Sequence, residues 1–352
     1  MKSYLNLVKE TLEQGVTEQT RTGVKALSIF GKSIEHDLNK NNFPLLTTKF
    51  VSLRLIASEL EFFIKGITDK RWLQARNNHI WDDWANPAII NKKYSFEKKD
   101  WENTLNDLYK EYLIDKAIID TPRLQTLFSG LYPYFILEND IWKQKKELND
   151  SEFVSVKSIL QKVAQYIERD LGPIYGFQWR HFGADYSTYD SNYDAKGFDQ
   201  LKFIIETLEN EPTSRRMILS AWNPSVKNQM ALEPCHYSLQ VNTANKKLNI
   251  LWSQRSVDLM LGLPFNIASY ALLLKLLGAQ SNFEDGKIVG QLGNVHIYET
   301  HKKGALEQIT REPKSLPILS LGNFTDIFNW NSNDIILENY EHYPSIKFPI
   351  AV

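Results

Sequence analysis

The stretch from Ile267 to Leu277 constrains the fold most, because it is apolar on almost every side of a helix. A helix with this pattern has to be buried, so other elements of the chain have to surround it. The 352 residues are enough to bury a sizeable core, in one large domain or in two. The sequence therefore predicts a central buried helix that begins at Asn266.

The composition limits the classes of protein to which this chain can belong. Hydrophobic (43%) and charged (24%) fractions are typical of a globular protein, and the net charge of −1 gives no overall attraction to DNA or to a membrane surface. A bound phosphate would need a local group of arginines. One cysteine cannot form an internal disulfide, which fits a reducing cytoplasm. The chain shows no signal-peptide pattern and no run of about 18 apolar residues, so we expect no membrane partner.

Cys235, the only cysteine, lies in the run Glu233-Pro234-Cys235-His236. A lone cysteine is commonly a small buried hydrophobe. Here Arg215-Arg216 precede it, and Gln254-Arg255-Ser256-Val257-Asp258 follow it. Nearby positive charge lowers the pKa of a thiol, and the thiolate is the nucleophile. The pattern favours a nucleophile beside an anion-binding site.

Glu59 breaks the apolar pattern of a helix predicted between Ser52 and Gly66. Leu55, Glu59 and Phe63 are four residues apart, so the carboxyl projects from the apolar face. One interpretation is that the polar face of this helix is wide enough to include Glu59, with Glu61 as its solvated partner. The other is a carboxyl in a dry cleft, where desolvation raises the pKa into a range useful for proton transfer.

Strand patterns surround the cysteine. Residues 236–243 and 248–256 flank Ala244-Asn245-Lys246, which predicts a β-hairpin. Arg215 and Arg216 are expected to open a strand. His296 and Tyr298 are two apart and share one face of a later strand, where packing is an alternative to ligand binding. Asn266 at a helix start is equally interpretable as a cap.

The runs SRRMILSAWNP, MALEPCH, QRSVDLMLGLPFNIASYALL and VHIYETH resemble the thymidylate synthases, folate-dependent enzymes that methylate dUMP. The resemblance extends from Arg21 to Val352 and is interrupted only at 86–169. It implies a single catalytic α/β (α+β) domain over 1–352, with a mixed or antiparallel sheet covered by helices. It also implies a homodimer formed through the sheet faces. We interpret 86–169 as a helical insertion subdomain, with helices at Trp101–Ile119 and Phe153–Arg169.

The resemblance implies a role for each candidate site residue. Cys235 adds to C6 of uracil, Asn266 reads the base, and Arg215 and Arg216 serve the partner subunit's site. The implied catalytic residues are Cys235, Glu59, Tyr175 and Asp258. The implied dUMP-binding residues are Arg21, Arg215, Arg216, His236, Gln254, Arg255, Ser256, Asp258, Asn266, His296 and Tyr298. The implied folate-binding residues are Ser52, Trp81, Trp84, Asp258, Gly262, Phe265 and Ala351.

The resemblance also implies the co-substrate and the product. 5,10-Methylenetetrahydrofolate would supply both the carbon and the hydride and become dihydrofolate, with no metal required. The apolar end of the chain is similar to a tail that closes over the folate. The alternatives are a phage-type dUMP hydroxymethylase and a catalytically silent nucleotide- or RNA-binding homologue. Three residues depart from the family pattern: Phe50 and Ser52, which bear on folate-tail binding, and Asn294.

Overall fold

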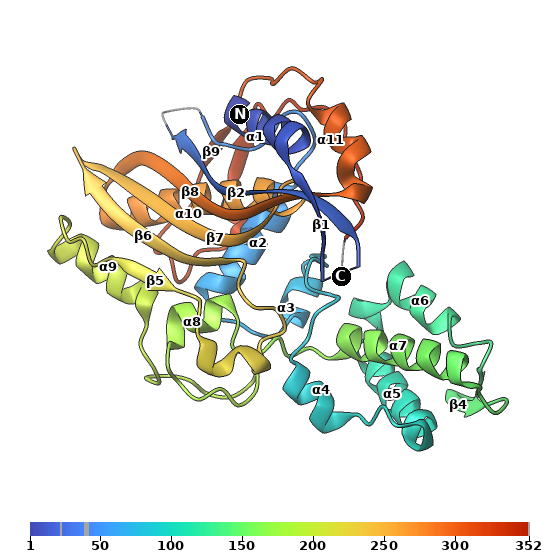
Figure 1. The fold of residues 1–352 in the computed structure, drawn as a ribbon. Coiled ribbons are helices and arrows are strands. Elements are labelled where there is room, and N and C mark those ends of the chain that lie inside the picture. Colours follow the sequence, from blue (N-terminus) through green and yellow to red (C-terminus); the bar gives the residue numbers. More distant parts are fainter. Residues whose placement is uncertain (22, 39–41, 351–352) are drawn as a thin grey trace.

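A six-stranded sheet is the main feature of the computed structural model, which describes residues 1–21, 23–38 and 42–350 (Figure 1). The strand order is β1-β2-β8-β7-β6-β5, and every neighbouring pair is antiparallel except β7 and β8. The prediction of a mixed, mainly antiparallel sheet is confirmed. The strands are β1 (Val16–Gln19), β2 (Lys25–Asp37), β5 (Ile218–Ser220), β6 (His236–Ala244), β7 (Lys247–Asp258) and β8 (Glu284–Tyr298).

Strands β6 and β7 form the predicted hairpin. Asn245 and Lys246 connect them with φ angles of 50° and 63°, the left-handed conformation that two-residue hairpin turns require. The pairing shifts by one residue between His236 and Ser238. Such a bulge leaves one residue unpaired and turns the neighbouring side chains, and here it lies directly after Cys235.

Helix α10 (Gly262–Ser281) is buried along nearly its whole length and connects the parallel strands β7 and β8. The prediction of a central buried helix is confirmed, but the predicted start at Asn266 is wrong. Asp258 accepts hydrogen bonds from the backbone N–H groups of Met260 and Leu261, so the chain turns into the helix earlier and Asn266 is not its cap. The helix is long and apolar enough to cross a membrane by length and composition, yet 67% of its apolar window is buried within the fold.

Further helices surround this core. Helix α2 (Leu53–Ile64) packs against α10 and against α8 (Tyr175–His181). The interpretation of Glu61 as a solvated partner of Glu59 is wrong. Glu61 is buried, accepts a hydrogen bond from the Ser332 backbone N–H and pairs with Lys65. The other elements of this part are α1 (Lys2–Gln14), α3 (Arg71–Gln74), α9 (Gln200–Asn210), α11 (Lys302–Gln308), β9 (Ile318–Ser320) and β10 (Ile336–Glu338).

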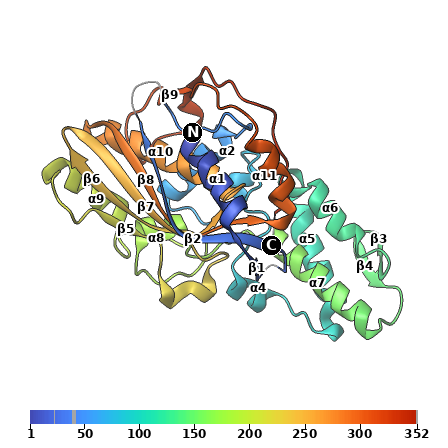
Figure 2. The ribbon, with the colours of Figure 1, turned by 45° about the horizontal axis from the view of Figure 1, so that its top comes forward.

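A second hydrophobic cluster lies between residues 85 and 167, separate from the one around α10. Its elements form a lobe at one end of the molecule in both Figure 1 and Figure 2. One predicted helix, Trp101–Ile119, is confirmed. The other begins earlier, because Asn149 and Glu152 form a capping box, and ends before extended Glu168. The lobe contains α4 (Pro87–Lys93), α5 (Trp101–Ile119), α6 (Pro122–Ser129), β3 (Phe135–Glu138), β4 (Ile141–Gln144) and α7 (Asp150–Ile167).

The burial of α10 generates a stability prediction. Leu272 is fully buried in this helix, so Leu272→Ala should lower the free energy of unfolding by about 2–5 kcal/mol through lost contacts and a cavity. Ile114 on α5 is 81% exposed, and Ile114→Ala should change it by about 0.5 kcal/mol or less. Urea unfolding of the two variants measures the difference. Equal losses would contradict the central position of α10.

Candidate active site

Cys235 lies directly before β6, and Tyr175, the first residue of α8, lies beside it. The Tyr175 hydroxyl accepts a hydrogen bond of 2.7 Å from the Cys235 backbone N–H. Phe63 of α2 stacks on the Tyr175 ring at 4.8 Å, and the His236 ring lies 4.5 Å away. Three elements far apart in the chain therefore fix the position of the thiol.

The thiol itself differs from the prediction. Burial raises the pKa of Cys235, and Arg255 and Tyr175 only partly oppose that effect. His236 supplies no positive charge, because burial lowers its pKa to about 3 and leaves the ring neutral, with Nδ1 2.9 Å from the Tyr270 hydroxyl. The prediction of a lowered thiol pKa is wrong.

Arg255 is the arginine that contacts the cysteine loop. Its guanidinium donates to the backbone carbonyls of Pro234 (2.9 Å) and Glu233 (2.8 Å), and its backbone N–H donates to the Cys235 carbonyl. Ser256 follows it on β7 and is half-buried. Arg255 is thus a structural clamp on the loop as well as a positive charge near the thiol.

Glu59 projects from α2 as predicted and is half-buried. The indole N–H of Trp81 donates to its carboxyl at 2.8 Å. Burial raises the pKa of Glu59 to about 7, although the Trp81 hydrogen bond acts in the opposite direction. Trp84 lies next to Trp81, with ring centroids 6.1 Å apart, and Trp81 also meets the Tyr175 ring edge-on at 6.0 Å.

Asn266 points toward the same group of residues. Its Oδ1 accepts a 3.1 Å hydrogen bond from Gln254, whose Oε1 in turn accepts from Trp252. Gln254 pairs with His236 across the hairpin, so Asn266 is connected to the residue that follows Cys235. Gly262 and Phe265 lie on the first turn of α10 and are both half-buried.

His296 and Tyr298 lie at the end of β8. His296 pairs with Asp258 of the parallel strand β7, and its Nδ1 is 2.9 Å from the Asn294 side-chain oxygen. Asn294 therefore orients the histidine. The intervening Ile297 is buried on the opposite face, as the alternation predicted.

Two buried residues near Asp258, Lys49 and His301, were not predicted from the sequence as site residues. Lys49 donates to the Met260 carbonyl, and burial lowers its pKa to about 8 against the attraction of Asp258. His301 is fully buried, with Nδ1 3.8 Å from Asp258 and Nε2 2.7 Å from the Pro349 carbonyl. No local pattern marks either residue, because Lys49 and Met260 are 211 positions apart.

Four other predicted site residues lie in loops. Arg21 is exposed between β1 and β2, and Ser52 is half-buried before α2. Arg215 and Arg216 do not open a strand, because β5 begins only at Ile218 and the loop before it holds both arginines on the surface. Ala351 lies outside the described residues.

Comparison with known proteins agrees with this geometry. A family model described as Thymidylate synthase matches residues 2–352. Over 350 residues, 99% of the chain, the sequence is 37% identical to the thymidylate synthase of Herpesvirus ateles, and the match covers 97% of that protein. It is 36% identical to the bifunctional dihydrofolate reductase-thymidylate synthase of Zea mays (54% covered) and 35% identical to the thymidylate synthase of Varicella-zoster virus, strain Dumas (93% covered). The chain therefore belongs to the thymidylate synthase family.

Proposed function

We propose how individual residues carry out the reaction of this family, the reductive methylation of dUMP to dTMP with 5,10-methylenetetrahydrofolate. The observation that carries the proposal is one continuous line of contacts from Cys235 to Tyr175, Trp81 and Glu59. The Cys235 sulfur and the Glu59 carboxyl, whose pKa is near 7, are thus connected through the rings of Tyr175 and Trp81. The reaction needs both groups, one to form a covalent bond and one to move a proton.

Cys235 is the proposed nucleophile. Its sulfur, once deprotonated, bonds to C6 of uracil and makes C5 electron-rich enough to attack the methylene carbon of the folate. The C5 proton then leaves with the assistance of Glu59 and Tyr175, the bond between the methylene carbon and the folate nitrogen breaks, and tetrahydrofolate is expelled. Hydride from that tetrahydrofolate completes the methyl group as the sulfur–C6 bond breaks, and dihydrofolate is released. Burial disfavours the thiolate, whereas the nearby charge of Arg255 favours it.

Asn266 is the proposed base reader. An amide presents both a donor and an acceptor, which matches the O4 and N3–H groups of uracil. Gln254 donates to its oxygen in the free protein and holds the amide in place. Cytosine presents the opposite pattern at these two positions, so the same amide disfavours dCMP.

The remaining nucleotide contacts surround this centre. Arg21, Arg255 and Ser256 are proposed to bind the phosphate together with two arginines of the partner subunit, since charge-assisted hydrogen bonds hold phosphate well. His296 and Tyr298 are proposed to bind the ribose hydroxyl. Neutral His236 and Gln254 complete the pocket.

The folate would lie against Trp81 and Trp84. Asp258 is proposed to hold the pterin, with Ser52, Gly262, Phe265 and Ala351 around it. Methylation is favoured over hydroxymethylation for two reasons. The relatives carry the name thymidylate synthase. The indole of Trp81 is also expected to exclude water from the reacting carbon, which favours hydride transfer over hydration. The lone cysteine and the family's chemistry support a cytoplasmic location as part of the same proposal.

Cys235→Ser tests the nucleophile. Turnover should fall at least about a thousandfold, because no other thiol is present, while dUMP binding stays within a few-fold since arginines hold the phosphate. Dihydrofolate absorbance and equilibrium dUMP binding measure the two effects. A variant that keeps more than about a tenth of wild-type turnover would exclude covalent catalysis by this residue.

Glu59→Gln tests the proton transfer. The carboxyl is mostly protonated below its pKa of about 7 and ionised above it, so the wild-type pH profile of kcat should change slope near that pH. The glutamine variant should lose this inflection and about a hundredfold or more of kcat. Exposed Glu147→Gln is the control and should keep the profile. An inflection that survives in Glu59→Gln belongs to another group.

Complementation tests the dimer. Arg215 and Arg216 are exposed near the edge strand β5, which suits a contribution to a neighbouring subunit. Inactive Cys235→Ser and inactive Arg216→Ala proteins, unfolded and re-paired in equal amounts, should regain about a quarter of wild-type activity, because half of the dimers then carry one complete site. Cys235→Ser with Glu59→Gln is the control and should regain none, as both residues serve the same site. Equal results for the two mixtures would refute the shared site.

A further inference from the structure

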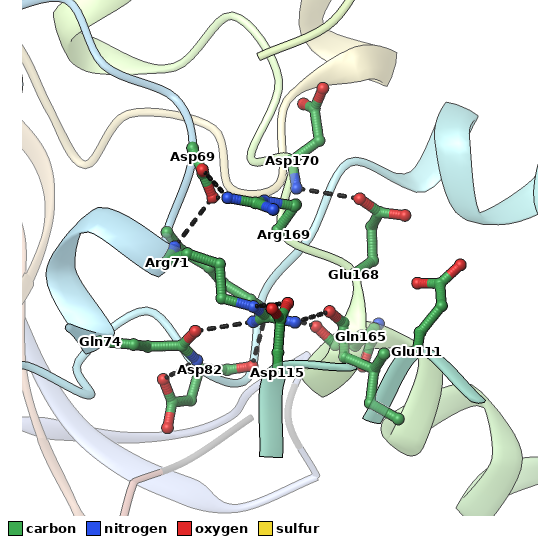
Figure 3. A network of polar contacts seen from close by, with 12 residues as sticks. Asp69, Arg71, Gln74, Asp82, Glu111, Asp115, Gln165, Glu168, Arg169 and Asp170 are labelled. Atoms are coloured by element: carbon green, nitrogen blue, oxygen red, sulfur yellow. Dashed lines mark hydrogen bonds and ion pairs between the residues drawn. The ribbon is translucent and has the colours of Figure 1, made fainter. Parts of the chain in front are cut away.

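The loop that carries Trp81 and Trp84 lies between the catalytic core and the lobe of residues 85–167. It runs from His79 to Asn86, between α3 and α4. Figure 3 shows a dense group of polar contacts at this junction, made by residues of α3, the loop, α5 and α7. The lobe therefore contacts the loop that carries the indoles of Trp81 and Trp84.

Lys70 is the centre of the junction and is fully buried. Its Nζ donates to three backbone carbonyls, those of Asp82 (3.1 Å), Trp84 (2.9 Å) and Gln165 (2.6 Å). Two of these belong to the loop and the third belongs to α7. Burial lowers the pKa of Lys70 to about 7, and these hydrogen bonds fasten the loop carrying the two tryptophans to the lobe.

Asp82 makes a second connection from the same loop. Its buried carboxylate accepts hydrogen bonds from the Tyr166 hydroxyl of α7 and from Gln74 of α3, and His79 lies 3.0 Å away. Burial alone would raise the pKa of Asp82, yet these hydrogen bonds hold it below its usual value. The loop carboxylate therefore stays charged and depends on Tyr166 for part of its solvation.

Arg71 makes the junction rigid from the other side. It donates to the Ile167 carbonyl at the end of α7 and to Asp115 of α5 at 2.7 Å, and it also holds Gln74. Both long helices of the lobe are thus tied to α3, the helix that precedes the loop. The contacts are directional hydrogen bonds, which specify position more closely than apolar packing does.

We propose that Tyr166 and Lys70 are positioning residues for the reaction, through which the lobe sets the place of Trp81 and Trp84 at the folate site. This inference rests on the proposed folate role of the two tryptophans. The path is short: Tyr166 and Lys70 hold the loop, and the loop holds the Trp81 indole that donates to Glu59. The lobe thereby acts on the reaction without touching either substrate.

Tyr166→Phe is the most specific variant, because it removes one hydroxyl and keeps the buried ring. It leaves the charged Asp82 one donor short, and the loop shifts or gains mobility. The KM for methylenetetrahydrofolate should rise about tenfold, while dUMP affinity stays within twofold. The pH inflection of kcat assigned to Glu59 should also move upward, because a weaker Trp81 hydrogen bond favours the protonated carboxyl. Steady-state kinetics across pH and equilibrium dUMP binding supply these values.

Two further variants make the result specific. Tyr112→Phe is the matched control, since Tyr112 is a buried tyrosine of the same lobe that packs against Tyr109 and Phe128, and it should leave the folate KM unchanged. In a double-mutant cycle, Asp82→Asn combined with Tyr166→Phe should cost less than the sum of the two single changes.

A Tyr166→Phe protein with wild-type folate KM and an unshifted pH profile would overturn the inference. Equal losses of folate and dUMP binding would also overturn it, because they indicate general destabilisation. Lys70→Met should raise the folate KM more than Tyr166→Phe does, and if it does not fold, Tyr166→Phe alone decides. A wild-type protein that forms no dTMP would instead contradict the proposed function, so the two failures are distinguishable.

Discussion

The burial of α10 is the constraint on which the rest of the structure depends. Its apolar surface has to be covered on every side, and the sheet, α2 and α9 supply that cover. Because α10 also connects parallel strands β7 and β8, its position fixes their register, which brings Asp258 beside His296 and Ser256 beside Asn294. The N-terminal part of the same helix presents Asn266 to Gln254. The packing of the core around α10 therefore also sets the geometry of the candidate site.

The site contains two acid–base groups that burial moves in the same direction. Burial raises the pKa of both Glu59 and Cys235, because the charged form of each loses water. For the carboxyl this shift is useful, because a group whose pKa lies near neutral pH can both accept and donate a proton there. For the thiol, burial opposes formation of the thiolate.

Much of this could be predicted from the sequence, and the failures at the candidate site come from the fold rather than from local spacing. The apolar run of α10, the side of α2 that carries Glu59 and the β6–β7 hairpin all follow from spacing within a few residues. The pKa of Cys235 was predicted wrongly because Arg215 and Arg216 lie on the surface, and because the burial of the thiol, which no local pattern shows, outweighs the charge of Arg255. Lys49, His301 and Lys70 gain their roles only from partners brought close by the fold, as with Lys70 and Gln165, 95 positions apart.

The two separate hydrophobic clusters have a consequence for how the chain unfolds. Apolar surface shared between two cores makes them melt together, whereas these two are connected at α3 and α7 mainly by hydrogen bonds and ion pairs. Such contacts form only when both partners are already folded, and they weaken as salt or water enters the junction. The strength of these contacts therefore decides how closely the unfolding of the two clusters is coupled.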